Sequence, residues 1–166
     1  MAENDVVDVT EVEEQPIDIN ESRMFVPDPE EESRAVQVAR KAYPNGRIYS
    51  VFFPYQGTFI IRAQLLNDVR EASLAADRAV DEHIRSLGGY VELEKLDEVT
   101  RARRLREIDD ISSDATNKVV LSSCVLYPTD VASKLEEGKL EAGTYQGLIG
   151  HILDISGFVN TQVREI

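Results

Sequence analysis

The spacing of apolar residues changes several times along the chain, and these changes predict where helices and strands lie. Over 30–42, small apolar residues return at every third or fourth position, which is typical of one face of an α-helix. Two runs rich in β-branched and aromatic residues follow at 48–53 and 58–61, and the proline and glycine of 54–57 indicate a turn between them. This part of the chain predicts a helix followed by a β-hairpin spanning 47–62.

The rest of the chain, up to Gly157, has the helical spacing. We expect helices at 66–87, 91–108, 114–127, 130–137 and 143–156. They are separated or ended by Gly88-Gly89, Ser112-Ser113, Pro128 and Gly157. In the helix at 91–108 we expect four residues to face inward: Leu93, Leu96, Val99 and Leu105.

The predicted fold class is α+β and mostly α, with one β-hairpin followed by a small helical bundle. Residues 30–166 are expected to form a single domain. Because a lone hairpin is only marginally stable in water, this hairpin must pack on the helices or join a sheet of another chain.

Charge separates the chain into two parts. Residues 1–33 carry 12 acidic side chains and a single basic one, Arg23, so they contribute −11 of the formal net charge of −13. The apolar residues of 1–23 are too few for their burial to offset the entropy of ordering the backbone. We therefore expect 1–29 to be an acidic tail, disordered or extended. It either solvates the domain or docks on a basic partner or on its own domain, with Met24 and Phe25 as its apolar anchor.

Composition excludes several classes of protein. One cysteine cannot form an internal disulfide or a cysteine-rich zinc site. No apolar run approaches the roughly 18–20 residues that span a bilayer, and the acidic start at 1–8 lacks the regions of a secretory signal. At a pI of 4.6 the chain repels nucleic acids and anionic lipids. We expect a soluble intracellular protein that binds neither nucleic acid nor membrane.

Few side chains could carry chemistry: His83, His151, Cys124 and the carboxylates of Asp109, Asp110 and Asp114. The histidines lack the further ligands that a metal site needs. The cysteine lies in an apolar helix and is expected to be buried and inert. The carboxylates lack the glycine and glutamate of a calcium loop and are expected to cap a loop. We therefore expect a protein that is not an enzyme, with no catalytic residue, no metal and no cofactor.

Two other features indicate contacts. One is a basic cluster in the last turns of the predicted helix 91–108, made of Arg101, Arg103, Arg104 and Arg106. It suits the negative end of that helix, and the alternatives are a dock for the acidic tail or a nucleic-acid site. The other is a pair of glycines, Gly147 and Gly150, inside the last helix, where each costs about 1 kcal/mol relative to alanine. We expect close approach of another helix or of a partner there.

The C-terminal half resembles a known family. Its motifs are Cys124-Val125-Leu126-Tyr127-Pro128, Gly143-Thr144 and a last helix ending in Ser156-Gly157-Phe158; upstream, Thr58-Phe59-Ile60-Ile61-Arg62 leads into a helix. Over 58–158 these motifs resemble the tail assembly chaperones of long-tailed bacteriophages. The resemblance implies a non-enzymatic chaperone that binds apolar helices of the tape-measure protein, tail tube subunits, or both, in the host cell cytoplasm.

The resemblance also implies an apolar groove in the last helices. Its expected residues are Val131, Leu135, Leu148, Ile152, Ile155 and Phe158, positions that equally suit an ordinary core. The alternative functions are a structural or accessory component of the virion, whose tail and hairpin contact neighbouring subunits, and a cellular adaptor module. Oligomers are possible in each case.

Overall fold

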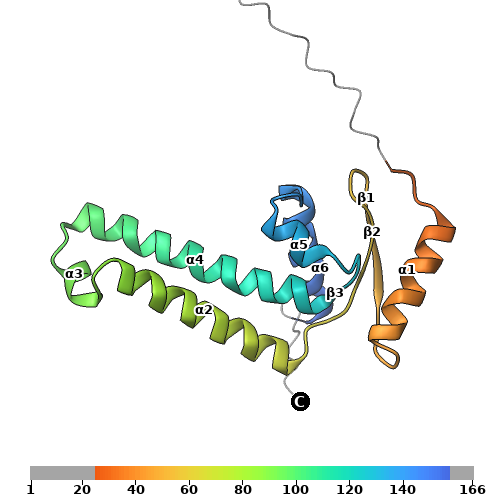
Figure 1. The fold of residues 1–166 in the computed structure, drawn as a ribbon, viewed down its shortest axis with the longest axis horizontal. Coiled ribbons are helices and arrows are strands. Elements are labelled where there is room, and N and C mark those ends of the chain that lie inside the picture. The colour runs from red at the N-terminus through yellow and green to blue at the C-terminus, as the bar shows by residue number, and fades with distance from the viewer. Residues whose placement is uncertain (1–24, 158–166) are drawn as a thin grey trace, which may run out of the picture.

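The computed structural model of the chain describes residues 25–157. The expected acidic tail up to residue 24, and Met24 and Phe158 with it, lie outside the described residues. A three-stranded antiparallel sheet stands near one end of the molecule (Figure 1), and it contains β1 (Tyr49–Phe53), β2 (Gly57–Ile61) and β3 (Val125–Tyr127) in that order.

The central strand β2 is buried along its whole length because helices cover both faces of the sheet. Alternate side chains of the strand therefore serve different layers. Ile60 packs with one helix, whereas Phe59 and Ile61 join a larger core on the opposite face.

The first face of the sheet is covered by α1 (Pro29–Ala42). The side chain of Asp28 accepts a hydrogen bond of 2.9 Å from the backbone N–H of Glu30 and begins the helix, with proline in its first turn. Ala35 and Ala39 are fully buried and, with Ile60, form the centre of this layer. Small residues at these positions let the helix lie close to the sheet.

The second face is covered by α5 (Val131–Glu136), α6 (Ala142–Ile155) and the end of α4 (Glu98–Cys124). The largest fully buried side chains of this layer are Phe59, Ile61, Leu121, Leu148 and Ile152. This layer is the main core of the described chain.

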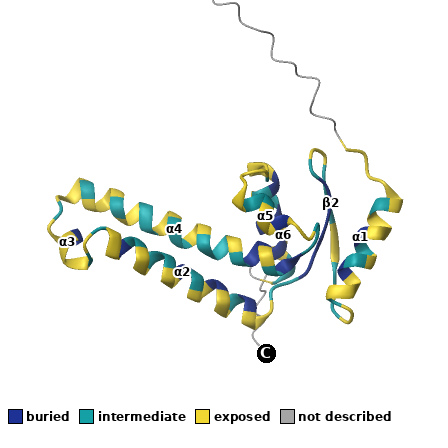
Figure 2. Cartoon of the chain, in the orientation of Figure 1, coloured by how far each residue is buried: buried dark blue, intermediate teal, exposed yellow. Residues whose placement is uncertain are grey.

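Two long antiparallel helices, α2 (Leu66–Ser86) and α4, project away from the sheet, and the short α3 (Tyr90–Glu94) joins them at the far end (Figure 1). We call residues 73–119 the arm and the remaining described residues the base. Figure 2 shows dark buried positions gathered in the base, while the arm is mostly half-buried or exposed.

The predicted fold class, α+β and mostly helical, is confirmed. The predicted helices at 30–42, 66–87, 130–137 and 143–156 and the hairpin at 47–62 agree with the observed elements within a few residues. Gly88 and Gly89 both adopt positive φ at the end of α2, which is the conformation expected of a glycine helix stop.

Two predicted elements are wrong. Ser112-Ser113 does not start a helix, because α4 runs without a break from Glu98. Its true cap is Asp97, whose side chain accepts a 3.0 Å hydrogen bond from the backbone N–H of Thr100. The preceding turns form the separate helix α3.

The second wrong element is the helix at 114–127, which the sequence predicts to continue through Val125. Residues 125–127 instead form β3, and this strand occupies the open edge of the hairpin. The sheet that the hairpin needs is therefore completed by its own chain.

Candidate functional site

The five described residues of the expected apolar groove belong to the core. Val131, Leu148 and Ile152 are at most 3% exposed, and Leu135 and Ile155 are partly buried against the same cluster. Their side chains point into the base and offer no open groove. An aspartate at Leu148 or Ile152 would place a charge in this core, so it would test folding and not binding.

Phe25, the described half of the expected apolar anchor of the tail, is half exposed at 49%. Its backbone N–H donates a 2.6 Å hydrogen bond to the carbonyl of Pro54, which fastens the start of the described chain to the β1–β2 turn. Its neighbour Val26 is 78% exposed. An apolar pair therefore lies beside this end of the hairpin.

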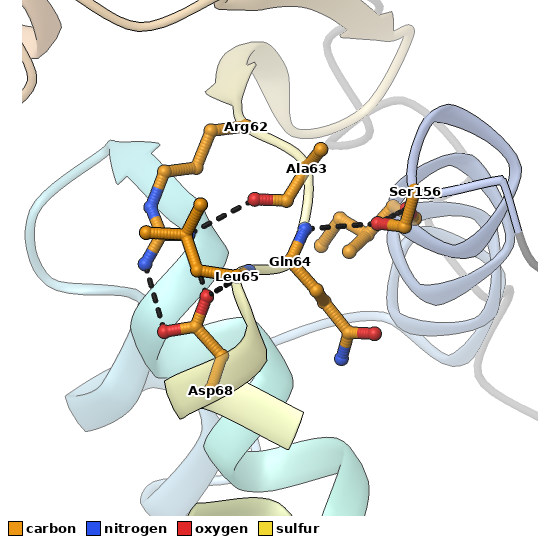
Figure 3. Close-up of polar contacts among 7 residues, drawn as sticks. Arg62, Ala63, Gln64, Leu65, Asp68 and Ser156 are labelled. Carbon is orange, nitrogen blue, oxygen red and sulfur yellow. Dashed lines mark hydrogen bonds and ion pairs between the residues drawn. The ribbon is translucent and has the colours of Figure 1, made fainter. Parts of the chain in front are cut away.

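A buried ion pair joins Arg62, the residue after β2, to Asp68 of α2 (Figure 3). The Nη1 and Nη2 atoms of Arg62 donate to Oδ2 and Oδ1 of Asp68 over 2.6 and 3.0 Å, and both side chains are only 10% exposed. Asp68 Oδ2 also accepts a 2.6 Å hydrogen bond from the backbone N–H of Leu65, the residue that precedes α2. The Arg62 guanidinium holds the pKa of Asp68 below its usual value.

We call residues 62–68 the junction. Its residues also contact residues at the ends of α1, α4 and α6. The backbone N–H of Arg62 donates to the carbonyl of Cys124 at the end of α4, and its guanidinium lies 5.4 Å from the ring centre of Tyr43, just after α1. The backbone N–H of Gln64 donates over 2.9 Å to Oγ of Ser156, just after α6 (Figure 3). Because the charged atoms bind other parts of the chain, we assign this junction a structural role.

The candidate catalytic side chains are not assembled. Cys124 is buried, and burial raises the pKa of its thiol to about 11, so the thiol stays protonated at neutral pH. His151 is exposed, with its ring centre 6.4 Å from that of Phe53. His83 is half-buried in the arm, and its Nε2 finds no hydrogen-bond partner among residues 25–157. Within that range no three His, Cys, Asp or Glu side chains gather as metal ligands would.

The aspartates expected to cap a loop lie instead on continuous helix in α4, where Asp114 pairs with Lys118 over 2.7 Å. The four arginines lie near the start of α4 and not in the last turns of a helix. Arg104 pairs with Glu107 over 2.6 Å, and Arg103 approaches the same glutamate at 3.9 Å. The cluster is therefore partly neutralised by its own helix.

The two glycines of α6 differ. A Cβ added at Gly147 would lie 2.7 Å from Cε1 of Phe53, so the close approach exists, but it comes from the strand β1 and not from another helix or a partner. A Cβ at Gly150 would meet nothing within 4 Å in the described chain.

The most exposed apolar residues of the arm lie at its far end. Tyr90, Val91 and Val99 are 63, 64 and 81% exposed, and we call these three residues the tip patch. Exposed apolar residues that gather in one region mark sites of interaction with other molecules. The prediction that Val99 and Leu105 face inward is wrong, since both are exposed. Sequence periodicity missed the tip patch because it assumes that every apolar helix position has a core to face.

A hollow of about 240 Å³ lies between α2, α4 and α6, where the arm meets the base. Its lining includes the apolar side chains of Val69, Ile149 and Leu153 and the polar side chains of Thr116 and Asn117. It contains no titratable side chain, so it offers no acid–base chemistry.

Comparison of the chain with family models, with curated proteins and with solved structures finds no match. None of the helices within 25–157 combines the length and apolar character needed to cross a bilayer.

Proposed function

We propose that this protein is a tail assembly chaperone of a long-tailed bacteriophage, acting without catalysis in the host cytoplasm. Its partners are apolar helices of the tape-measure protein, the tail tube subunits, or both. The motifs within 58–158 that resemble this family support the identity of the partners. The observation that carries the binding mode is the tip patch at the end of the projecting arm.

The physical need for such a protein follows from the shape of its partner. A long amphipathic helix exposes an apolar stripe that aggregates in water unless another surface covers it. Helical surfaces with exposed apolar residues pack against such stripes, as in other helix-recognition modes. The net charge of −13 keeps the complex soluble by repulsion between copies.

The test is co-expression of the full chain with the tape-measure protein of its phage. Wild type should keep the tape-measure protein in the soluble fraction, and the variant Tyr90→Ser, Val91→Ser, Val99→Ser should lose this effect. The change removes apolar contact area but no buried side chain, so the melting temperature should stay close to wild type.

A matched control removes exposed apolar side chains in the base: Phe25→Ser, Val26→Ser and Tyr55→Ser. These residues are 49, 78 and 47% exposed, and this variant should retain full solubilising activity. A folded tip variant that solubilises the tape-measure protein as well as wild type does would contradict the proposal.

The second candidate is a component of the virion itself. It is favoured by β1, which forms one edge of the sheet and can accept a strand from a neighbouring subunit, next to the exposed Phe25 and Val26. Mass spectrometry of purified particles separates the two candidates. A virion component is found there in many copies, whereas an assembly chaperone is absent.

A further inference from the structure

The arginines and the aspartates of α4 lie in separate stretches of the helix. Its arginines lie at 101–106, and its aspartates, Asp109, Asp110 and Asp114, all follow residue 107; the exposed Glu98 precedes the arginines and the exposed Lys118 follows the aspartates. Within the part of the chain that the structure describes, neither Arg106 nor Asp109 nor Asp110 lies in an ion pair of 4.0 Å or less. Charges of both signs are therefore available on one helix, in two separate blocks.

One side of the helix carries both blocks. At 100° per residue, Ala102, Arg103, Arg106, Asp109, Asp110 and Ser113 lie on the side opposite to the half-buried Arg104, Ile108 and Ile111. We call these first six residues, all exposed, the charged face. No residue of α4 before Val120 is buried, because α2 covers only one side of this helix in the arm.

We propose that the charged face binds the same face of a second copy of this chain, antiparallel, about a two-fold axis between residues 107 and 108. In this register Arg106 lies opposite Asp109 of the partner subunit. Because the two helices run antiparallel, the positive end of each helix dipole also lies near the negative end of the other. A parallel pairing would instead place arginine opposite arginine and aspartate opposite aspartate.

The register brings small residues together on both sides of the axis. Ala102 lies opposite the partner's Ser113, and the short side chains allow the two helix backbones to approach. A two-fold interface makes each contact twice, so every cross-chain ion pair has a symmetric copy. Each exposed ion pair contributes little, so the dimer is weak and dissociates when salt screens the charges. The proposal does not rest on the proposed function, because it uses no residue of the tip patch.

The test uses the full chain in analytical ultracentrifugation at low and high salt. Wild type should be a reversible dimer at low salt. The variants Arg103→Glu/Arg106→Glu and Asp109→Lys/Asp110→Lys should each raise the dissociation constant at least about tenfold, because like charges then face each other. Mixing the two variants should restore a dimer containing one copy of each.

The control is Arg70→Glu/Arg78→Glu. It changes the net charge by the same amount as Arg103→Glu/Arg106→Glu, but at exposed positions of α2. It should dimerise as wild type does. Circular dichroism should show that all variants keep the wild-type helix content, since every changed residue is exposed. A monomeric wild type at all concentrations, a dimer that survives both charge reversals, or reversed variants that do not pair with each other would overturn the proposal.

Discussion

The two long helices α2 and α4 run through both the base and the arm, yet these two regions are stabilised differently. In the base, α4 packs against β3, α5 and α6, Ala72 of α2 joins the same core, and buried side chains such as Phe59 and Leu148 are fully enclosed. Along most of the arm these helices pack on each other, and α4 also packs on α3. The buried residues there are Ala76, Ile84 and Leu93, each 4 to 8% exposed.

The difference shows that layers, and not helix length, determine how much apolar surface is buried. A helix between two layers hides its apolar face completely, whereas one of a lone pair leaves about half of its circumference in water. Leu74 and Leu105 remain 53% exposed for this reason. The base is thus the stable platform, and the arm presents surface to other molecules.

The largest predicted effect is at the junction where the arm enters the base. Asp68→Ala removes the partner of the buried Arg62 guanidinium, which then carries an uncompensated charge. We expect a loss of about 3–5 kcal/mol in the free energy of unfolding, measured by urea denaturation. A loss below 1 kcal/mol would mean that the junction does not hold the base together.

The pH dependence of Asp68→Asn sharpens this prediction. Because the pKa of Asp68 is lowered in the folded chain, its contribution is complete above the unfolded pKa of about 3.9 and is lost as pH falls below that value. Wild type should therefore exceed the variant in stability at pH 7. The gap should narrow below about pH 4, and a gap unchanged down to pH 2 would contradict this account.

The second prediction makes one substitution in each region. Leu148→Ala removes a fully buried side chain from the base and should cost about 2–5 kcal/mol of stability. Leu105→Ala in the arm removes a half-exposed side chain from a helix that tolerates alanine well, so its effect should stay within about 0.5 kcal/mol. Thermal unfolding of both variants measures the difference directly. An equal loss of stability in the two variants would contradict the view that the base is more tightly packed than the arm.

The smallest expected effect on stability comes from replacing the two glycines of α6, which differ in their surroundings. Gly150→Ala meets no neighbour and should gain about 0.5–1 kcal/mol from its helix propensity. Gly147→Ala pushes its methyl group against the ring of Phe53, which packs edge-on against Phe59 with ring centres 5.5 Å apart. The strain should outweigh the propensity and leave this variant about 1–2 kcal/mol less stable than wild type. Calorimetry of the two variants should show melting temperatures that move in opposite directions.

The sequence predicted the elements that local signals define. Pro29 with the acids after it, the turn at 54–57, and the glycines at 88 and 89 each mark a boundary that the structure keeps. The strand β3 was missed because three residues are too few for a period to separate strand from helix. Its pairing depends on β2, which is more than 60 residues earlier in the chain.

The candidate binding surface was harder to predict for the opposite reason. Apolar residues at helical spacing near Leu148 and near Val99 look alike in sequence. Only the arrangement of layers decides that Leu148 is enclosed while Val99 is 81% exposed. The Arg62–Asp68 pair likewise needs the segment after β2 to fold back, so that Arg62 meets a side chain of the helix that follows.

The direct passage of α4 into β3 has a mechanical consequence. At 1.5 Å per residue, the 27 residues of α4 form a rod of about 40 Å, and its last residue is followed at once by a strand of the sheet. A molecule that pulls on the far end of α4 therefore pulls, through the helix, on the edge strand β3. The force acts on the pairing of β3 with Ile60 and Ile61 of β2.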